Sequence, residues 1–139
     1  MRQLKIPVRV YFQDTDAGGV VFHAQYFAFM ERARSELLNA AGIDLARVVE
    51  ERRLLFVVHG IVASFHAPAR LNDMLAVSAE VAKMGRASVV FRQRVEREGT
   101  LLVEAEIALA LVDRDRMKPA RMPEEIATAL GAVHKQALT

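Results

Sequence analysis

The sequence has no cysteine and no tryptophan, and its charges nearly cancel, with 19 Lys and Arg against 17 Asp and Glu. Without cysteine there can be no disulfide framework, no thiolate metal site and no cysteine nucleophile, so any chemistry must use oxygen, imidazole or backbone groups. A net charge of +2 spread along the chain argues against nucleic-acid binding. The length of 139 residues predicts a single domain, residues 1–139, without a second one.

Long hydrophobic runs are also missing. The longest, such as residues 107–112, are far below the roughly 20 residues of a membrane-spanning helix, and no apolar segment of the kind found in signal peptides follows the charged start. We therefore expect a cytoplasmic protein without membrane insertion. Because His59, His66 and His134 are scattered and lack the spacing of metal ligands, we expect neither a metal nor another cofactor.

Strand-like patterns occupy most of the chain. Residues 4–13 alternate apolar and polar side chains, and four later segments are rich in Val, Ile, Leu and Phe. These later segments are residues 54–66, 74–84, 88–97 and 101–113. Because only short connections separate the last three, we expect an antiparallel meander there.

Helical patterns flank these later strands. Residues 23–41 repeat apolar side chains at steps of three and four, and Gly42 follows at the place of a C-cap glycine. A short helix with Asp44 as its N-cap is expected next, and a final helix runs from Pro123 through residue 138. The order predicts an α+β domain in which a five-stranded antiparallel sheet wraps around the long helix, the arrangement of the hotdog fold.

The stretch most informative about chemistry is residues 10–38, VYFQDTDAGGVVFHAQYFAFMERARSELL. Two carboxylates, Asp14 and Asp16, follow a strand, and a long helix begins near His23. The N-terminus of a helix offers unpaired N–H groups to an oxygen that becomes negative during a reaction, and a nearby carboxylate can act as nucleophile or general base. The pattern indicates acyl transfer to water. A thioester is favoured because a thiol of pKa about 8.5 leaves without a strong general acid.

Four segments carry a resemblance to a known family. They are VRVYFQDTDAGGVVFHAQY (8–26), FMERARSE (29–36), APARLNDML (67–75) and MKPARMP (117–123). They resemble the hotdog thioesterases related to 4-hydroxybenzoyl-CoA thioesterase, and most of all the Tol-Pal-associated acyl-CoA thioesterases of Gram-negative bacteria. The resemblance implies hydrolysis of acyl-CoA to a free acid and CoA by a homotetramer built from dimers, with each active site at a dimer interface. It also implies links to acyl carrier protein and to the Tol-Pal system.

The resemblance also implies roles for individual residues. Asp16 is expected to be the catalytic carboxylate, and the backbone N–H of His23 is expected to donate to the thioester carbonyl oxygen. Asp14 is expected to be structural, accepting backbone N–H bonds or orienting its neighbour. Gly18 and Gly19 are expected beside the substrate, mainly because they permit unusual backbone angles. The role of the His23 imidazole stays open.

Further substrate contacts are expected outside this loop. Glu31 either faces the acyl group or pairs with Arg34 three residues later on the helix. CoA carries phosphates, so basic residues at strand ends are candidates to bind it, and these are Arg70, Lys83 and Arg86.

The sequence departs from the family pattern at three positions. Phe12 and Phe22 stand where relatives often carry Tyr, and Asn72 stands where Asp is expected. The loss of the two hydroxyls is expected to affect acyl preference, without touching Asp16 or the helix start. Two other functions stay open: a hotdog dehydratase or isomerase with a His base, and a non-catalytic subunit that binds acyl-CoA or acyl carrier protein.

Overall fold

A computed structural model describes residues 3–136 of the chain and contains a five-stranded antiparallel sheet of order β1-β3-β4-β5-β2. The strands are β1 (Leu4–Arg9), β2 (Leu54–Phe65), β3 (Met74–Met84), β4 (Ser88–Arg97) and β5 (Thr100–Asp113). The predicted meander is confirmed, since β4 pairs with both β3 and β5. Strands β1 and β2 lie at the two edges, beside β3 and β5 respectively.

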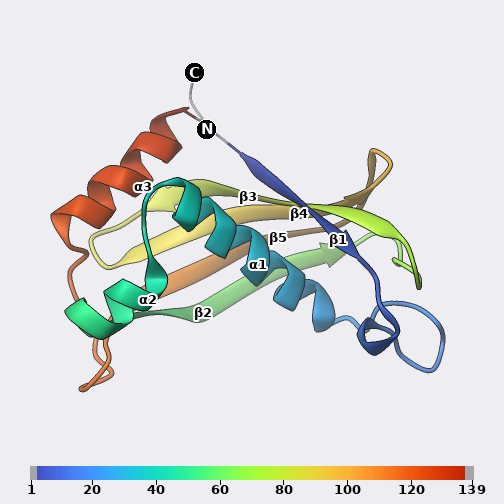
Figure 1. Cartoon of the computed structure of the whole chain (residues 1–139), viewed down its shortest axis with the longest axis horizontal. Helices are drawn as coiled ribbons and strands as arrows, with labels where there is room; N and C mark the ends of the chain where they lie inside the picture. The colour runs from blue at the N-terminus through green and yellow to red at the C-terminus, as the bar shows by residue number, and fades with distance from the viewer. Residues whose placement is uncertain (1–2, 137–139) are drawn as a thin grey trace.

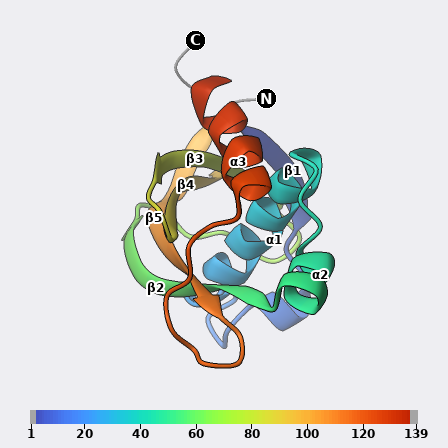
Figure 2. The same ribbon diagram turned by 90° about the vertical axis from the view of Figure 1, so that its left-hand side faces the viewer.

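Helix α1 (Gln25–Ala40) lies against one face of the sheet, which curves around it (Figures 1 and 2). It begins two residues later than predicted, because residues 23 and 24 form a turn. It ends at Ala40, one residue earlier than predicted, and the expected glycine follows, with Gly42 at a φ of +85°. Its buried face, which includes Phe29, Met30 and Leu37, belongs to the same apolar core as the inward side chains of the strands.

The other helices lie at the C-terminal end of α1 (Figure 1). Helix α2 (Leu45–Arg47) continues into the π-helical turn η2 (Val48–Arg52). The predicted N-cap is confirmed, because the Asp44 carboxylate accepts the backbone N–H groups of Ala46 and Arg47. Helix α3 (Glu124–Gln136) follows Pro123, and residues 137 and 138 of its predicted range lie outside the described residues. None of the helices in residues 3–136 is long and apolar enough to cross a membrane.

The first predicted strand, residues 4–13, is too long. Strand β1 ends at Arg9, and a 3-10 turn, η1 (Phe12–Asp14), follows. The turn forms because Asp14 donates its backbone N–H to the Tyr11 carbonyl and accepts the Tyr11 N–H on its carboxylate. An alternating pattern cannot reveal such a local side-chain bond, and Phe12 is in fact 81% exposed.

Candidate active site

The segment between β1 and α1 is organised around Asp14, whose side chain is buried. Its Oδ2 accepts the Tyr11 N–H at 2.8 Å, and its Oδ1 accepts a hydrogen bond from Gln25 Nε2 at 2.9 Å. Its carbonyl oxygen accepts the Phe22 N–H at 3.0 Å. Asp14 therefore joins the loop to the first turn of α1, in agreement with the structural role expected for it.

Asp16 lies in a tight loop two residues further on. Its backbone N–H donates to Val20 O at 2.9 Å, and its carbonyl accepts the Gly19 N–H at 3.1 Å. Its carboxylate Oδ1 accepts the Gly18 N–H at 2.8 Å. The side chain is exposed, and Oδ2 has no hydrogen-bond partner within residues 3–136. The loop thus holds one carboxylate oxygen and leaves the other without a protein partner among the described residues.

The two glycines of this loop serve different purposes. Gly19 has a φ of +78°, a conformation that side chains with a Cβ rarely adopt. A Cβ on Gly18 would lie only 3.2 Å from Asp16 Oδ1. Gly19 therefore permits the turn, and Gly18 leaves room for the carboxylate.

The start of α1 lacks the usual side-chain cap. Ala24 is its N-cap, and no acidic residue lies in the first turn. Within the described part of the chain, the backbone N–H groups of His23 and Ala24 have no acceptor. Such free donors, together with the helix dipole, suit an oxygen that gains negative charge. The His23 ring is exposed and lies against the Phe22 ring, with centroids 4.5 Å apart.

The connection between β2 and β3 packs against this site. Val21 donates its N–H to Ala69 O at 2.9 Å, and Val20 forms an isolated β-bridge with Arg70. Ala69 in turn donates its N–H to Tyr26 Oη at 2.9 Å. Burial raises the pKa of the Tyr26 hydroxyl, although the Ala69 bond opposes this shift. These contacts place Arg70 beside the loop that carries Asp16.

An ion pair holds the same connection in shape. Arg97 Nη1 donates to Asp73 Oδ2 at 2.7 Å and to Pro68 O at 3.2 Å. Burial alone raises the pKa of Asp73, but the Arg70 backbone N–H and the Arg97 guanidinium together outweigh it, so the pKa is lowered. Asn72 stands between these groups with a φ of +71°, which Asn tolerates better than most residues.

Several groups that organise the site were missed by reasoning from sequence: Gln25, Tyr26, Asp73 and Arg97. Their partners lie between 11 and 43 residues away along the chain. No local pattern marks such pairs. The packing of the residue 66–73 connection identifies Tyr26, Asp73 and Arg97, and the hydrogen bond to Asp14 identifies Gln25.

The structure places the remaining candidates on other elements than the loop that carries Asp16. Glu31 is exposed, near the middle of α1. Lys83 is near the end of β3, and Arg86 lies in the turn that follows. Since a strand rises about 3.3 Å per residue, these two lie roughly 30 Å from the end of β3 near Arg70. Arg86 and Arg121 line a cavity of about 740 Å³ at the start of α3.

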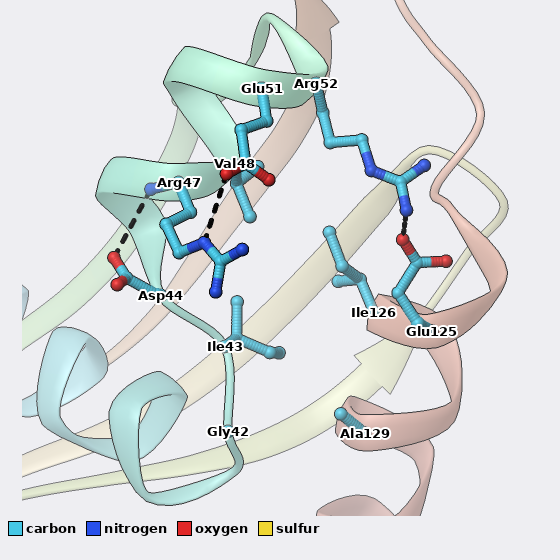
Figure 3. Close-up of a pocket in the computed structure, with 10 residues that line it drawn as sticks. All are labelled: Gly42, Ile43, Asp44, Arg47, Val48, Glu51, Arg52, Glu125, Ile126 and Ala129. Atoms are coloured by element: carbon cyan, nitrogen blue, oxygen red, sulfur yellow. Dashed lines mark hydrogen bonds and ion pairs between the residues drawn. The ribbon is translucent and has the colours of Figure 1, made fainter.

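Four cavities in the described part of the chain are lined by residues other than Asp16 and His23. Figure 3 shows one of about 300 Å³ between η2 and α3, where Ile43, Val48 and Ile126 form an apolar floor. It lies at the C-terminal end of α1, because Gly42 and Ile43 line it, whereas the loop with Asp16 precedes the N-terminal end of α1. Among residues 3–136, no three His, Asp or Glu side chains are placed to hold a metal ion. Asp16 and His23 are both exposed on the single chain.

Comparison with known proteins identifies the class. Residues 18–104, more than half of the chain, match the thioesterase superfamily, and the chain belongs to that superfamily. It is 49% identical over 121 residues to the acyl-CoA thioester hydrolase YbgC of Escherichia coli O157:H7, which covers 86% of this chain and 90% of that protein. It is 42% identical over 123 residues to the acyl-CoA thioesterase YbgC of Haemophilus influenzae, covering 88% and 90%.

Solved structures confirm the predicted α+β hotdog fold. A hypothetical protein from Thermus thermophilus is 35% identical with a TM-score of 0.87, covering 94% of this chain and 98% of the other. A probable thioesterase from Bartonella henselae is also 35% identical, with a TM-score of 0.81 and coverage of 87% and 99%. A 1,4-dihydroxy-2-naphthoyl-CoA thioesterase from Synechocystis, 21% identical with a TM-score of 0.84 and coverage of 93% and 96%, shares the fold.

Proposed function

We propose that this chain is an acyl-CoA thioesterase that hydrolyses acyl-CoA to a free acid and CoA. The observation that carries the proposal is the pairing of a carboxylate that has a free oxygen, Asp16, with a helix start that has free N–H groups at His23 and Ala24. Asp14 ties the two together. The names of the YbgC relatives support acyl-CoA as the substrate class.

In this proposal, Asp16 acts in one of two ways. Its carboxylate attacks the thioester carbonyl, expelling CoA thiolate and leaving a mixed anhydride that water then hydrolyses. Alternatively, it takes a proton from a water molecule that attacks the same carbon. In both cases the carbonyl oxygen becomes negative beside the His23 N–H, and loss of such a donor typically costs about two to three orders of magnitude in rate. Trapping of a radiolabelled acyl group on the enzyme in a quenched single turnover supports the first route, and its absence supports the second.

The activity is tested by thiol release from a panel of short, long and aromatic acyl-CoA substrates. Asp16→Asn keeps the size of the side chain but removes its charge, so we expect a fall in kcat of about 10³-fold with the fold retained. Asp115→Asn, at an exposed aspartate paired with Arg53, is the matched control and should keep its activity.

Each alternative has its own outcome in that panel. Binding of acyl-CoA without release of CoA would support the non-catalytic subunit. Conversion of the acyl chain with the thioester intact would support a dehydratase or isomerase. Near-full activity of Asp16→Asn would reject the role of Asp16 even if CoA is released.

The basic residues that are candidates to bind CoA lie far apart, so we propose separate roles for them. Arg70 is beside Asp16 of its own chain, and we propose that it binds a phosphate of CoA there. Lys83 and Arg86 lie at the far end of β3. We propose that they bind the CoA of a substrate that is hydrolysed by the Asp16 of another copy of the chain. The contact between Glu31 and the acyl group also stays a prediction.

The exposed edge of the sheet supports assembly of several copies. Strand β2 has 12 residues and exposes Val58, Ile61 and Val62, and within residues 3–136 it pairs only with β5. A long apolar edge without Pro or Lys is a template for pairing with another chain. The other edge, β1, has only 6 residues and contains Pro7. We propose that two copies pair through β2, as the first step toward the expected homotetramer. The cytoplasmic location and the links to acyl carrier protein and the Tol-Pal system stay predictions.

A further inference from the structure

We propose that Gln25 is a positioning residue, which sets the geometry between Asp16 and the N–H groups at the start of α1 through its hydrogen bond to Asp14. The inference rests on the proposed function, because it concerns the same site. Gln25 itself does not react. Its role is to keep two reacting groups, which belong to different segments, at a constant separation.

The contacts that carry this inference converge on Asp14. Its two carboxylate oxygens hold opposite sides of the site: Oδ2 accepts the Tyr11 N–H of the turn after β1, and Oδ1 accepts Gln25 Nε2 from the first residue of α1. The backbone of Asp14 adds a third link through the Phe22 N–H. Of these links, only the one from Gln25 joins the carboxylate directly to α1.

The proposed reacting groups lie very close to these links along the chain. Asp16 is two residues from Asp14, and the free N–H groups of His23 and Ala24 immediately precede Gln25. A shift of the first turn of α1 relative to Asp14 would therefore change the distance between the carboxylate and the oxyanion donors. A misplacement of about 1 Å at a reacting centre can cost about 10²-fold in rate.

The surroundings make the bond between Asp14 and Gln25 hard to replace. Asp14 is only 4% exposed, and Gln25 is partly buried. Water therefore has little access to take over the contact. Ala24, the N-cap of α1, has no side-chain oxygen with which to anchor the helix start. The Gln25 side chain thus does the anchoring that an N-cap side chain does elsewhere.

An exchange of the two functional groups tests this role. Gln25→Glu places two carboxylates against each other at the site of the 2.9 Å bond, where like charges repel. Asp14→Asn together with Gln25→Glu restores a complementary pair, in which the new amide at position 14 donates to the new carboxylate at position 25. The amide oxygen at position 14 can still accept the Tyr11 N–H. Ala28→Glu adds a carboxylate at an exposed position of the same helix end and controls for charge alone.

We expect Gln25→Glu to lower kcat about 10- to 100-fold with KM little changed, because the effect is on alignment in the transition state. The double variant should recover most of this loss, and Ala28→Glu should behave like the unmodified chain. Gln25→Ala, which removes the bond without adding charge, should also lower kcat and serves if Gln25→Glu does not fold. Thermal unfolding and size-exclusion chromatography are measured for each variant to check that it folds and assembles like the unmodified chain.

Three results would overturn the positioning role: unchanged kcat in both Gln25 variants, a loss in Gln25→Glu that the exchange does not rescue, or a loss confined to KM. These results can be told apart from a result that rejects the proposed function. An unmodified chain that releases no CoA from any acyl-CoA would reject that function, whereas an active chain with an indifferent Gln25 would reject only the positioning role.

Discussion

Arg34 Nη1 donates a hydrogen bond of 3.0 Å to Gln93 Oε1 inside the core, joining α1 to β4. Gln93 is fully buried, and its Nε2 donates to Met30 O at 2.8 Å and to Ser78 O at 3.2 Å. Burial lowers the pKa of the Arg34 guanidinium, and the charge of Glu31 opposes this effect. A buried cation therefore depends on a neutral amide that also holds the helix to two strands.

Gln93→Leu should destabilise the fold, because it leaves the Arg34 guanidinium buried without its acceptor. Since hydrogen bonds to charged groups contribute about 1.5–3 kcal/mol, we expect a loss near the upper end of that range in urea unfolding. Arg34→Met combined with Gln93→Leu removes both polar partners and should recover much of the loss. A double variant no more stable than Gln93→Leu would contradict this account.

Tyr26→Phe should cost about 1–2 kcal/mol of unfolding free energy, because the Ala69 N–H would lose its acceptor in a buried place. Tyr11→Phe is the matched control, since Tyr11 is 61% exposed. It should change stability by less than about 0.5 kcal/mol. Equal effects of the two substitutions in chemical denaturation would show that the Tyr26 hydroxyl contributes nothing specific.

Asp73 should make part of the stability sensitive to acid. The pKa of Asp73 is lower in the folded chain than the unfolded value of about 3.9. Its contribution to the free energy of unfolding is therefore complete above the unfolded pKa and is lost as the pH falls through the folded pKa. Tm measured from about pH 6 down to about pH 2 should therefore fall less steeply for Asp73→Asn than for the unmodified chain. Parallel curves of Tm against pH for the two proteins would show that Asp73 does not make the stability sensitive to acid.

The exposed edge of β2 should be the contact between two copies. Ile61→Lys together with Val62→Lys places charges on this edge and should convert the assembly into smaller species. Thr100→Lys, at the exposed start of β5, controls for added charge and should leave the assembly unchanged. Light scattering coupled to size exclusion measures the mass of each, and an unchanged mass in the double variant would rule out this edge.

Most element boundaries could be predicted, because alternation and helical spacing are local properties. Strands β3 and β4 occur at the predicted residues, and β2 and β5 differ from their predictions by one residue. The first strand was overextended because the Asp14 side chain, rather than a sheet partner, satisfies the Tyr11 N–H. The order of β1 and β2 in the sheet depends on which distant strands pair, and no local pattern encodes that choice.

By itself, the sequence determined the chemistry that is available: a loop with two carboxylates and two glycines, followed by the start of a long helix. It also carried the resemblance to the family, through four short segments that are spread between residues 8 and 123. Only the tertiary structure decided that Arg70 lies beside Asp16 while Lys83 and Arg86 lie at the far end of β3. It alone revealed the bond between Gln25 and Asp14. The physical reason is that periodicity acts over neighbouring residues, whereas hydrogen bonds across the fold depend on which segments pack together.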